Sequence, residues 1–101
     1  MFPSHDLRAR GVENTYWRVI IDGYGYLGHI DMVKGELDSA SQNFKKAGRI
    51  ASTRWETKKT NEEKVESADY ARRAVYWFMC SEWVNVLSDD HSNGSDMGER
   101  S

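Results

Sequence analysis

A glycine-rich run in the first third of the chain has the spacing of a phosphate-binding loop. Residues 23–28 read Gly-Tyr-Gly-Tyr-Leu-Gly, which fits the pattern G-x-G-x-x-G, and they follow an apolar run that ends at Ile21. In dinucleotide-binding folds such glycines let the backbone approach a pyrophosphate at the start of a helix. The second strand of such a fold would be residues 50–55 (IASTRW), which are too polar for a parallel strand covered on both faces. A chain of 101 residues also holds at most half of a doubly wound sheet. A dinucleotide-dependent enzyme is therefore only the third hypothesis, and no cofactor is predicted.

The other residue types that carry chemistry are scattered. His5, His29 and His91 lie in different segments, and no His-x-x-x-His or Cys-x-x-Cys spacing directs ligands toward a metal. Cys80 lies in an apolar stretch, where a thiol behaves as a small buried hydrophobe with a raised pKa. No pair of carboxylates and no Ser-His-Asp arrangement stands out. We therefore predict no catalytic residue, no metal site and no enzymatic activity.

Basic residues are concentrated in the middle third of the chain. Residues 45–73 hold 9 basic and 5 acidic side chains, whereas residues 1–44 hold 4 and 6, and residues 74–101 hold 1 and 5. This segregation predicts a positive end of the molecule that contacts phosphates or acidic proteins. A solvated helix surface is the simpler explanation of the same pattern. The sequence pI of about 5.9 is far below the value above 9 that is typical of nucleic-acid domains. Nucleic-acid binding through residues 45–73 is therefore the alternative function.

Aromatic residues are more numerous than one small core requires. The chain has four Trp and five Tyr, and Trp, Tyr and Arg are enriched among the residues that dominate binding energy at protein interfaces. We expect about half of these rings to form the core and the rest to contact a partner. The predicted partner-binding residues are Arg54, Trp55, Lys58, Lys59, Arg72, Arg73, Tyr76, Trp77 and Trp83.

A β-hairpin is predicted over residues 15–30. Residues 15–21 (TYWRVII) are rich in aromatic and β-branched types, which favour strands. The dipeptide Asp22-Gly23 that follows is a strong signal for a two-residue type I′ turn, with residues 24–30 as the returning strand. A helix through the same residues is the rival interpretation. It would have to include several glycines, each at a cost of about 1 kcal/mol relative to Ala.

Two helices are predicted after the hairpin. Apolar residues recur at spacings of 3 and 4 from Ile30 to Ala51, which predicts a helix over about 31–52, with a later start at Asp38 if the returning strand is longer. Thr60 and Glu63 form a capping box that predicts a second helix over about 61–87. This last helix carries two apolar stripes, so either the hairpin or a second chain must cover one of them. The stripes are Val65, Ala68, Val75, Met79 and Val86, and Tyr70, Ala74, Trp77, Val84 and Leu87.

The composition is that of one small folded domain. The chain is 39% hydrophobic and 30% charged, with a net charge of −2. It has no run of 18 apolar residues and no secretory signal, and its single cysteine excludes an intrachain disulfide, so a cytoplasmic location is expected. We expect an irregular arm over residues 1–14, a compact domain over 15–88 and a disordered polar tail over 89–101.

Together these features predict an α+β domain in which an N-terminal β-hairpin packs on two antiparallel helices, with an all-α helical bundle as the alternative. The predicted function is that of a small non-enzymatic adaptor or inhibitor, which docks on a protein through aromatic anchors and a basic tip of the helical hairpin. A phage or mobile-element factor that acts on a host protein is one form such a molecule takes, although no residue argues for it. A homodimer through the last helix is also expected, and membrane association is not.

Overall fold

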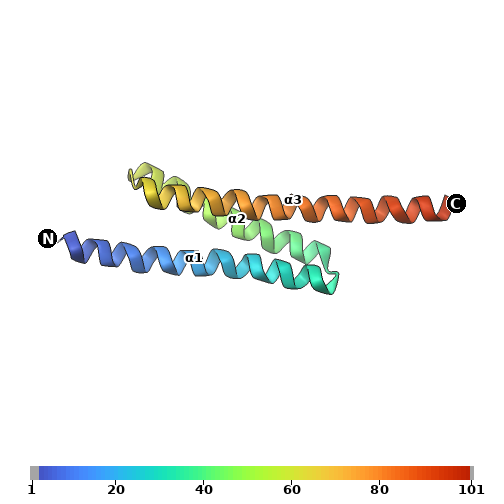
Figure 1. Cartoon of the computed structure of the whole chain (residues 1–101), viewed down its shortest axis with the longest axis horizontal. Helices are drawn as coiled ribbons and strands as arrows, with labels where there is room; N and C mark the ends of the chain where they lie inside the picture. Colours follow the sequence, from blue (N-terminus) through green and yellow to red (C-terminus); the bar gives the residue numbers. More distant parts are fainter. Residues whose placement is uncertain (1–2, 101) are drawn as a thin grey trace.

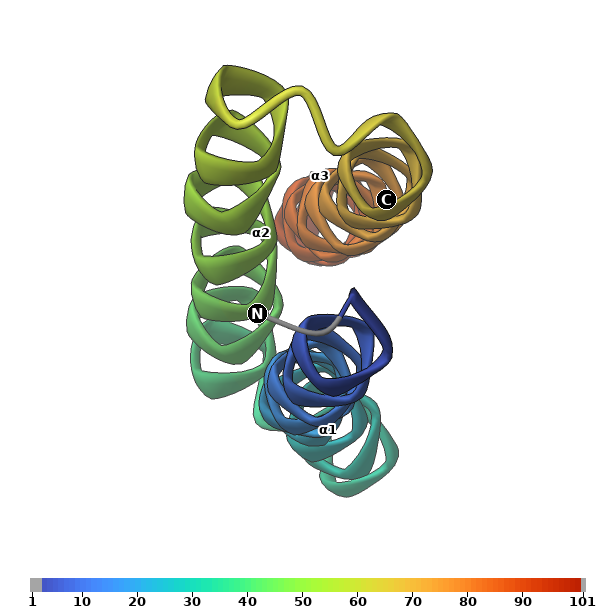
Figure 2. The same cartoon turned by 90° about the vertical axis from the view of Figure 1, so that its left-hand side faces the viewer.

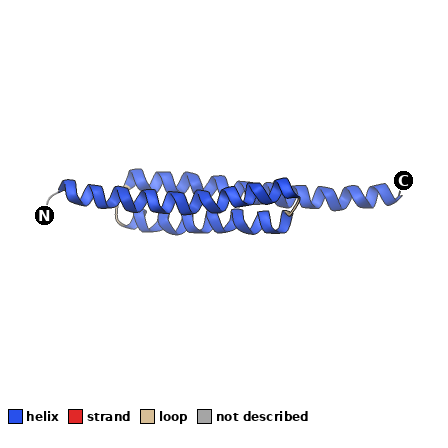
Figure 3. Cartoon of the chain, turned by 90° about the horizontal axis from the view of Figure 1, so that it is seen from below, coloured by secondary structure: helices blue, strands red, loops and turns tan. Residues whose placement is uncertain are grey.

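The computed structural model describes the backbone of residues 3–100 and the side chains of residues 9–89. Within this part, the chain forms three α-helices, α1 (Pro3–Lys34), α2 (Leu37–Thr60) and α3 (Lys64–Arg100), and has no strand. The helices are joined by short turns, and the two termini lie at opposite ends of the molecule (Figure 1). The end of α3 projects beyond the other two helices (Figure 3). The result is an elongated molecule of 72 × 22 × 13 Å.

The central helix of the arrangement is α2. Both α1 and α3 pack against it on the same side, and they approach each other less closely than either approaches α2 (Figure 2). Side chains bridge the space between α1 and α3. The surfaces open to a partner are therefore this α1–α3 seam and the outer faces of the helices.

The predicted α+β class is wrong, and the all-α alternative is confirmed. Residues 15–30 lie in the middle of α1, and Asp22-Gly23 occupies helical positions instead of a hairpin turn. In a strand, Val19 and Ile21 would share one face of the sheet. In α1, Ile21 is fully buried while Val19 is exposed.

Close packing of aromatic rings on two glycines explains why the glycine-rich run is helical. A Cβ on Gly25 would overlap with the indole of Trp77, and a Cβ on Gly28 would lie 2.7 Å from the ring of Phe44. The missing side chains thus let α1 sit close to α2 and α3. Burial of large rings is worth about 1.5–3 kcal/mol each, which offsets the poor helix propensity of the glycines.

The turn between α1 and α2 is a Schellman motif. Gly35 has a φ of +82°, a left-handed conformation that glycine adopts without strain. Its N–H donates to the carbonyl of Met32 at 3.0 Å, and the N–H of Glu36 donates to that of Asp31 at 2.8 Å. The predicted helix over 31–52 is therefore divided, because α1 ends at Lys34 and α2 begins at Leu37.

The turn between α2 and α3 has the same geometry without a glycine. Glu62 has a φ of 60°, and its N–H donates to the carbonyl of Lys59 at 3.1 Å. The helix α2 continues to Thr60, past residue 52, where the sequence pattern predicted its end. The second predicted helix consequently starts at Lys64 and not at residue 61.

The first and last segments are helical as far as the backbone is described. Residues 3–14, predicted as an irregular arm, lie in α1. Residues 89–100, predicted as a polar tail, lie in α3. No helix in the described residues has the length and apolarity to cross a bilayer.

The core lies along α2, whose buried apolar residues are three alanines and the large ring of Phe44. The predicted apolar stripe is confirmed from Ala40 to Ala51, whereas Ile30 and Val33 belong to α1 and are exposed. Of the two stripes on α3, the one that contains Trp77 is buried and the one that contains Met79 is exposed. The buried apolar residues are Ile21, Ala40, Phe44, Ala47, Ala51, Tyr70, Ala74, Trp77 and Val84.

Candidate functional site

Two of the predicted tip cations form ion pairs inside the chain. Lys58 is only 3% exposed, and its Nζ lies 3.1 Å from Oε2 of Glu63 and 3.6 Å from Oε1 of Glu13. Arg54 also pairs with Glu13. A buried ammonium needs such partners because its desolvation is costly. Arg54 and Lys58 therefore connect the end of α2 to α1 and to the turn that precedes α3.

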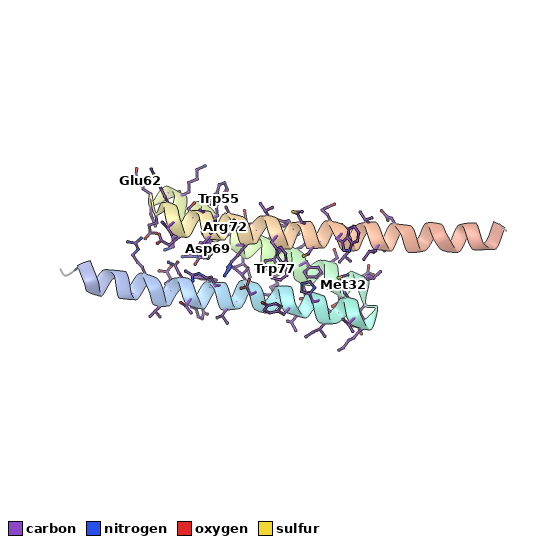
Figure 4. All side chains as sticks on the ribbon, in the orientation of Figure 1. Met32, Trp55, Glu62, Asp69, Arg72 and Trp77 are labelled. Atoms are coloured by element: carbon purple, nitrogen blue, oxygen red, sulfur yellow. The ribbon has the colours of Figure 1, made fainter. Side chains whose placement is uncertain are left out.

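The predicted anchor Trp55 lies near the same end of the molecule (Figure 4). Its ring is partly buried against the core, and Nζ of Lys59 lies 5.0 Å from its centroid. This distance is within the range of a cation–π contact. Trp55 and Lys59 thus contact each other at the tip of the helical hairpin, about where the sequence pattern placed them.

Arg73 and Arg72, both on α3, differ in their surroundings. Arg73 lies 3.6 Å from Asp22 and 3.8 Å from Asp69, so it bridges α1 and α3. Arg72 is 3.9 Å from Asp69, and its side chain is 77% exposed. Of this pair, Arg72 is the cation that is available to an acidic partner.

Trp77 was predicted to bind a partner, but the structure places it in the core. It is 3% exposed and lies between α1 and α3 (Figure 4). Its ring stacks on Phe44 with a centroid distance of 5.8 Å, and its Nε1 donates to Oδ1 of Asp22 at 3.3 Å. An indole that is satisfied in this way stabilises the fold.

The two remaining rings of the predicted set, Tyr76 and Trp83, are exposed by 53% and 59%. Both border an apolar groove of about 460 Å³ that runs between α1, α2 and α3. Met32, which lines this groove, is labelled in Figure 4 and shows that the groove lies toward the C-terminal end of α1. The residues that line this apolar groove are His29, Met32, Phe44, Tyr76, Met79, Cys80 and Trp83.

The lining of the apolar groove suits the binding of an apolar ligand. Two methionines and three aromatic rings give it an adaptable, weakly polar lining. Burial raises the pKa of the Cys80 thiol above its ordinary value, which disfavours the thiolate that a nucleophile requires. Among the described residues, no group of three or more His, Cys, Asp or Glu is placed to hold a metal.

A charged hollow of about 360 Å³ adjoins the groove and shares Tyr76 with it. Arg72, Arg73 and Asp69 line it from α3, and Asp22 lines it from α1. One flank of α3 therefore presents Arg72, Tyr76 and Trp83 in succession. These are three of the nine predicted partner-binding residues, whereas Trp55 and Lys59 lie apart from them at the tip.

Several residues of the apolar groove were not predicted from the sequence. His29 was missed because residues 24–30 were assigned to a strand, and Met32 because it was assigned to the helix over 31–52 and not to the helix that packs next to α3. Met79 and Cys80 follow Tyr76 by one helical turn, so the helical spacing of the last segment contains the signal for them. The spacing on α3 does not identify Phe44 as a residue that lines the apolar groove, because Phe44 comes from α2.

No known protein-family model matches the chain, and no curated protein sequence and no solved structure matches it significantly.

Proposed function

We propose that this chain is a small, non-enzymatic cytoplasmic binding protein that holds an apolar helical segment of a protein partner in the apolar groove. Tyr76 and Trp83 act as the anchors, and the methionines adapt to the partner's side chains. Arg72 attracts acidic residues next to the apolar segment.

The observation that carries this proposal is the exposure of two large rings beside an apolar hollow. Tyr76 and Trp83 are more than half exposed, and Met79 between them is also exposed. Large apolar patches on a small protein are a liability for solubility unless a partner covers them. Aromatic residues next to a pocket are the usual centre of binding energy at protein interfaces.

The preference for a helical segment follows from the shape and the charge of the site. The groove is bounded by three helices, and apolar grooves between helices take amphipathic helices with anchors at i, i+3 or i+4, and i+7. Arg72 is highly exposed at one end of the α3 flank. An acidic residue one or two turns from the apolar anchors would pair with it, which increases specificity and the rate of association.

Nucleic-acid binding through residues 45–73 has less support. Arg54 and Lys58 are engaged by Glu13 and Glu63, and Lys59 lies against Trp55. Each cation that pairs within the chain is unavailable to neutralise a phosphate, and phosphate contacts dominate nucleic-acid affinity. Binding of single-stranded DNA in place of a peptide would favour this alternative.

The test is a selection of helical peptides from a displayed random library against the immobilised full-length chain. We expect enriched peptides to share apolar anchors at helical spacing and an acidic residue at one end. Trp83→Ala should weaken their binding by about 30-fold, which corresponds to about 2 kcal/mol for an interface anchor. Dissociation constants are measured by fluorescence anisotropy with labelled peptides.

Met79→Lys and Val75→Lys provide a matched comparison on α3. Both positions are exposed, but only Met79 lines the apolar groove. Met79→Lys should abolish peptide binding, whereas Val75→Lys should leave it unchanged. Equal affinity of the peptides for wild type and Trp83→Ala would refute the proposal. So would a failure to enrich any peptide while single-stranded DNA binds with a steep dependence on salt.

A further inference from the structure

Sulfur and imidazole side chains gather at one place in the molecule. Within residues 9–89, whose side chains the structure describes, the chain has two methionines, one cysteine and one histidine. All four of them line the apolar groove, together with three aromatic rings. We call these four residues the sulfur–imidazole cluster, which consists of His29, Met32, Met79 and Cys80.

The sulfur–imidazole cluster is assembled from two helices that are distant in sequence. His29 and Met32 come from α1 and lie about one helical turn apart, whereas Met79 and Cys80 are neighbours on α3. Both helices pack on the same side of α2 (Figure 2), so the cluster reaches the groove from two sides. The fold therefore collects every thioether, thiol and imidazole of its described side chains in one hollow.

Contact with an apolar partner does not require this set of side chains. Methionine serves such contact well because it is flexible and polarizable. An imidazole and a thiol, however, add groups that can donate electron pairs to a lining that is otherwise aromatic. The property that thioethers, thiols and imidazoles share is affinity for soft metal ions.

We propose that the sulfur–imidazole cluster binds one monovalent copper ion, Cu(I). The ion lies between α1 and α3 and links two helices that approach each other less closely than either approaches α2. The proposal goes beyond the proposed function and does not depend on it.

The types of ligand select Cu(I) over the common divalent ions. Magnesium and calcium prefer carboxylates, and no Asp or Glu of the described residues lines the groove. Structural zinc takes four ligands from Cys, His, Asp and Glu, whereas the groove offers one Cys and one His. Thiolates and thioethers together are the ligands that select Cu(I).

The balance of charge also favours a monovalent ion. When Cys80 binds the ion, its thiol releases a proton to the solvent and becomes a thiolate, and the copper remains Cu(I). One thiolate, a neutral imidazole and two thioethers then form a complex of no net charge with the ion. A divalent ion with the same ligands would keep a positive charge. The described lining of the groove has no charged residue to compensate it, so such a complex would be costly to desolvate.

Neighbouring residues support two of the proposed ligands. Tyr76 forms a hydrogen bond with Cys80, and the ring of His29 packs edge-on against Phe44 with a centroid distance of 5.0 Å. Contacts that orient a ligand strengthen a metal site. Met79 is 66% exposed, so its flexible side chain is free to adjust its sulfur to the ion.

Anaerobic titration of the full chain with Cu(I) tests the proposal. The ion is supplied as a complex with a coloured Cu(I) chelator, and its transfer to the protein is followed by the loss of the chelator's absorbance. We expect the chain to take up one Cu(I) ion and to retain it in an excess of Zn²⁺. A chain that takes up no Cu(I), or that loses it to Zn²⁺, would overturn the proposal.

The double variant Met32→Leu/Met79→Leu removes both thioethers and nearly conserves the volume of the side chains. It should lower the affinity for Cu(I) by at least about 100-fold, since loss of a supporting group alone costs a metal site up to that factor. Cys80→Ser should have an effect of the same size. Circular dichroism checks that each variant retains its helix content.

Met97→Leu is the matched control for the double variant. Residue 97 lies 17 residues beyond Cys80 on α3, which is about 25 Å at a rise of ~1.5 Å per residue. This variant should bind Cu(I) as tightly as wild type. Unchanged affinity of Met32→Leu/Met79→Leu would overturn the proposal, because copper would then be held without the thioethers.

X-ray absorption at the copper edge identifies the ligands of the bound ion. We expect sulfur and imidazole neighbours in the wild-type complex, fewer sulfur neighbours in Met32→Leu/Met79→Leu, and no imidazole in His29→Phe. A copper ion surrounded only by nitrogen and oxygen in wild type would contradict the proposed site.

The copper site and the proposed function can fail separately. Trp83→Ala should weaken the binding of peptides but retain Cu(I), because the indole is not one of the proposed ligands. Met32→Leu/Met79→Leu, assayed with a copper chelator present, should retain the peptides because leucine keeps the lining apolar. A chain that binds peptides but no Cu(I) would refute the copper site alone, and the converse result would refute the proposed function alone.

Discussion

Trp77 and Trp83 lie only six residues apart on α3, yet one is 3% exposed and the other 59%. Six residues correspond to 600° of helical rotation, so the two rings point to different sides of the helix. Residue type alone therefore could not separate core aromatics from candidate anchors. The angular position of each ring on α3 does separate them, provided that residues 3–34 are assigned to a helix against which Trp77 packs.

Gly25 provides a test of this packing at the level of one residue. In Gly25→Ala the new methyl group would overlap with the indole of Trp77, which Phe44 and Asp22 hold in place. We expect an overpacking cost of about 1–3 kcal/mol, larger than the gain in helix propensity of up to ~1 kcal/mol. Urea unfolding should therefore show a net loss of stability.

Gly11→Ala is the control for this experiment, because a Cβ at Gly11 meets no atom within 4 Å. It should be neutral or slightly stabilising. A stabilised Gly25→Ala protein would mean that Trp77 does not rest on α1.

The reactivity of Cys80, which lines the apolar groove, depends on the pKa of its thiol and therefore on its burial there. Burial raises the pKa of its thiol above the ordinary value, although the hydrogen bond with Tyr76 acts in the opposite direction. The reactive thiolate is therefore scarcer at neutral pH than in a free cysteine. We expect alkylation by iodoacetamide to be slower than that of a model thiol at pH 7 and to rise toward it only at more alkaline pH.

A peptide bound in the groove should slow this alkylation further. The rate is followed by mass spectrometry of the intact chain, which has a single cysteine. Alkylation at neutral pH as fast as that of free cysteine would contradict the described environment of Cys80.

At the level of elements, the sequence predicted the helical segments that follow residue 30 but misplaced their ends. The apolar spacing from Ala40 to Ala51 indicated α2, and the spacing from Ala74 onward indicated α3. The break at Gly35 was missed because the spacing of 3 and 4 continues from Ile30 across the turn. Thr60 and Glu63 have capping-box identities, but their backbones form the end of one helix and the turn before the next.

The hairpin error has a physical cause in tertiary packing. The residue types of 15–30 fit a strand, and Asp22-Gly23 fits a tight turn. Two of the glycines are instead contact points for Trp77 and Phe44, which come from α3 and α2. Local propensity does not contain that information, because the partners are distant in sequence.

Glu62 offers a test of the turn between α2 and α3. It adopts a left-handed conformation with a φ of 60°, which costs a non-glycine residue roughly 1–2 kcal/mol. Glu62→Gly should remove this strain. The net stabilisation should be at most about 1 kcal/mol, because glycine gains more conformational entropy on unfolding and this offsets part of the relieved strain. Thermal unfolding should show a higher midpoint.

Gly35→Ala is the reciprocal variant at the turn between α1 and α2. It forces a Cβ onto a φ of +82° and should lower the midpoint. A destabilised Glu62→Gly protein would show that contacts of the Glu62 side chain outweigh the backbone strain.

At the scale of the whole molecule, α1 is joined to α3 mainly by side chains. Asn14 and Tyr70 form a buried hydrogen bond across the seam, in which the Tyr70 hydroxyl donates to Oδ1 of Asn14 at 2.9 Å. Arg18 and Asp69 form an ion pair at 3.1 Å nearby. The sequence did not predict these polar links because their members lie more than 50 residues apart.

The Tyr70 link predicts how the stability of the whole fold depends on pH. Burial raises the pKa of Tyr70 above its ordinary value of 10.0, so the folded state holds this proton more tightly than the unfolded state. This contribution to the free energy of unfolding is fully present below pH 10.0 and is lost as the pH rises through the folded-state pKa. Urea unfolding across this range should therefore show a decline above pH 10.

Tyr70→Phe separates this effect from other alkaline changes. It should be less stable at neutral pH by about 1 kcal/mol, because it leaves Asn14 without its donor. Its stability should also decline less steeply above pH 10 than that of wild type. Identical slopes for the two proteins would exclude Tyr70 as a cause of the decline.

The central claim is that the apolar groove beside Tyr76 and Trp83 is the surface that binds a partner. The most direct measurement is NMR of the full chain labelled at its indole N–H groups and methionine methyl groups, titrated with a selected helical peptide. We expect saturable shifts of Trp83, Met32 and Met79, and unchanged signals for Trp17 and Trp55. Shifts centred on Trp55 with Trp83 unaffected would place the binding surface at the tip and contradict the claim.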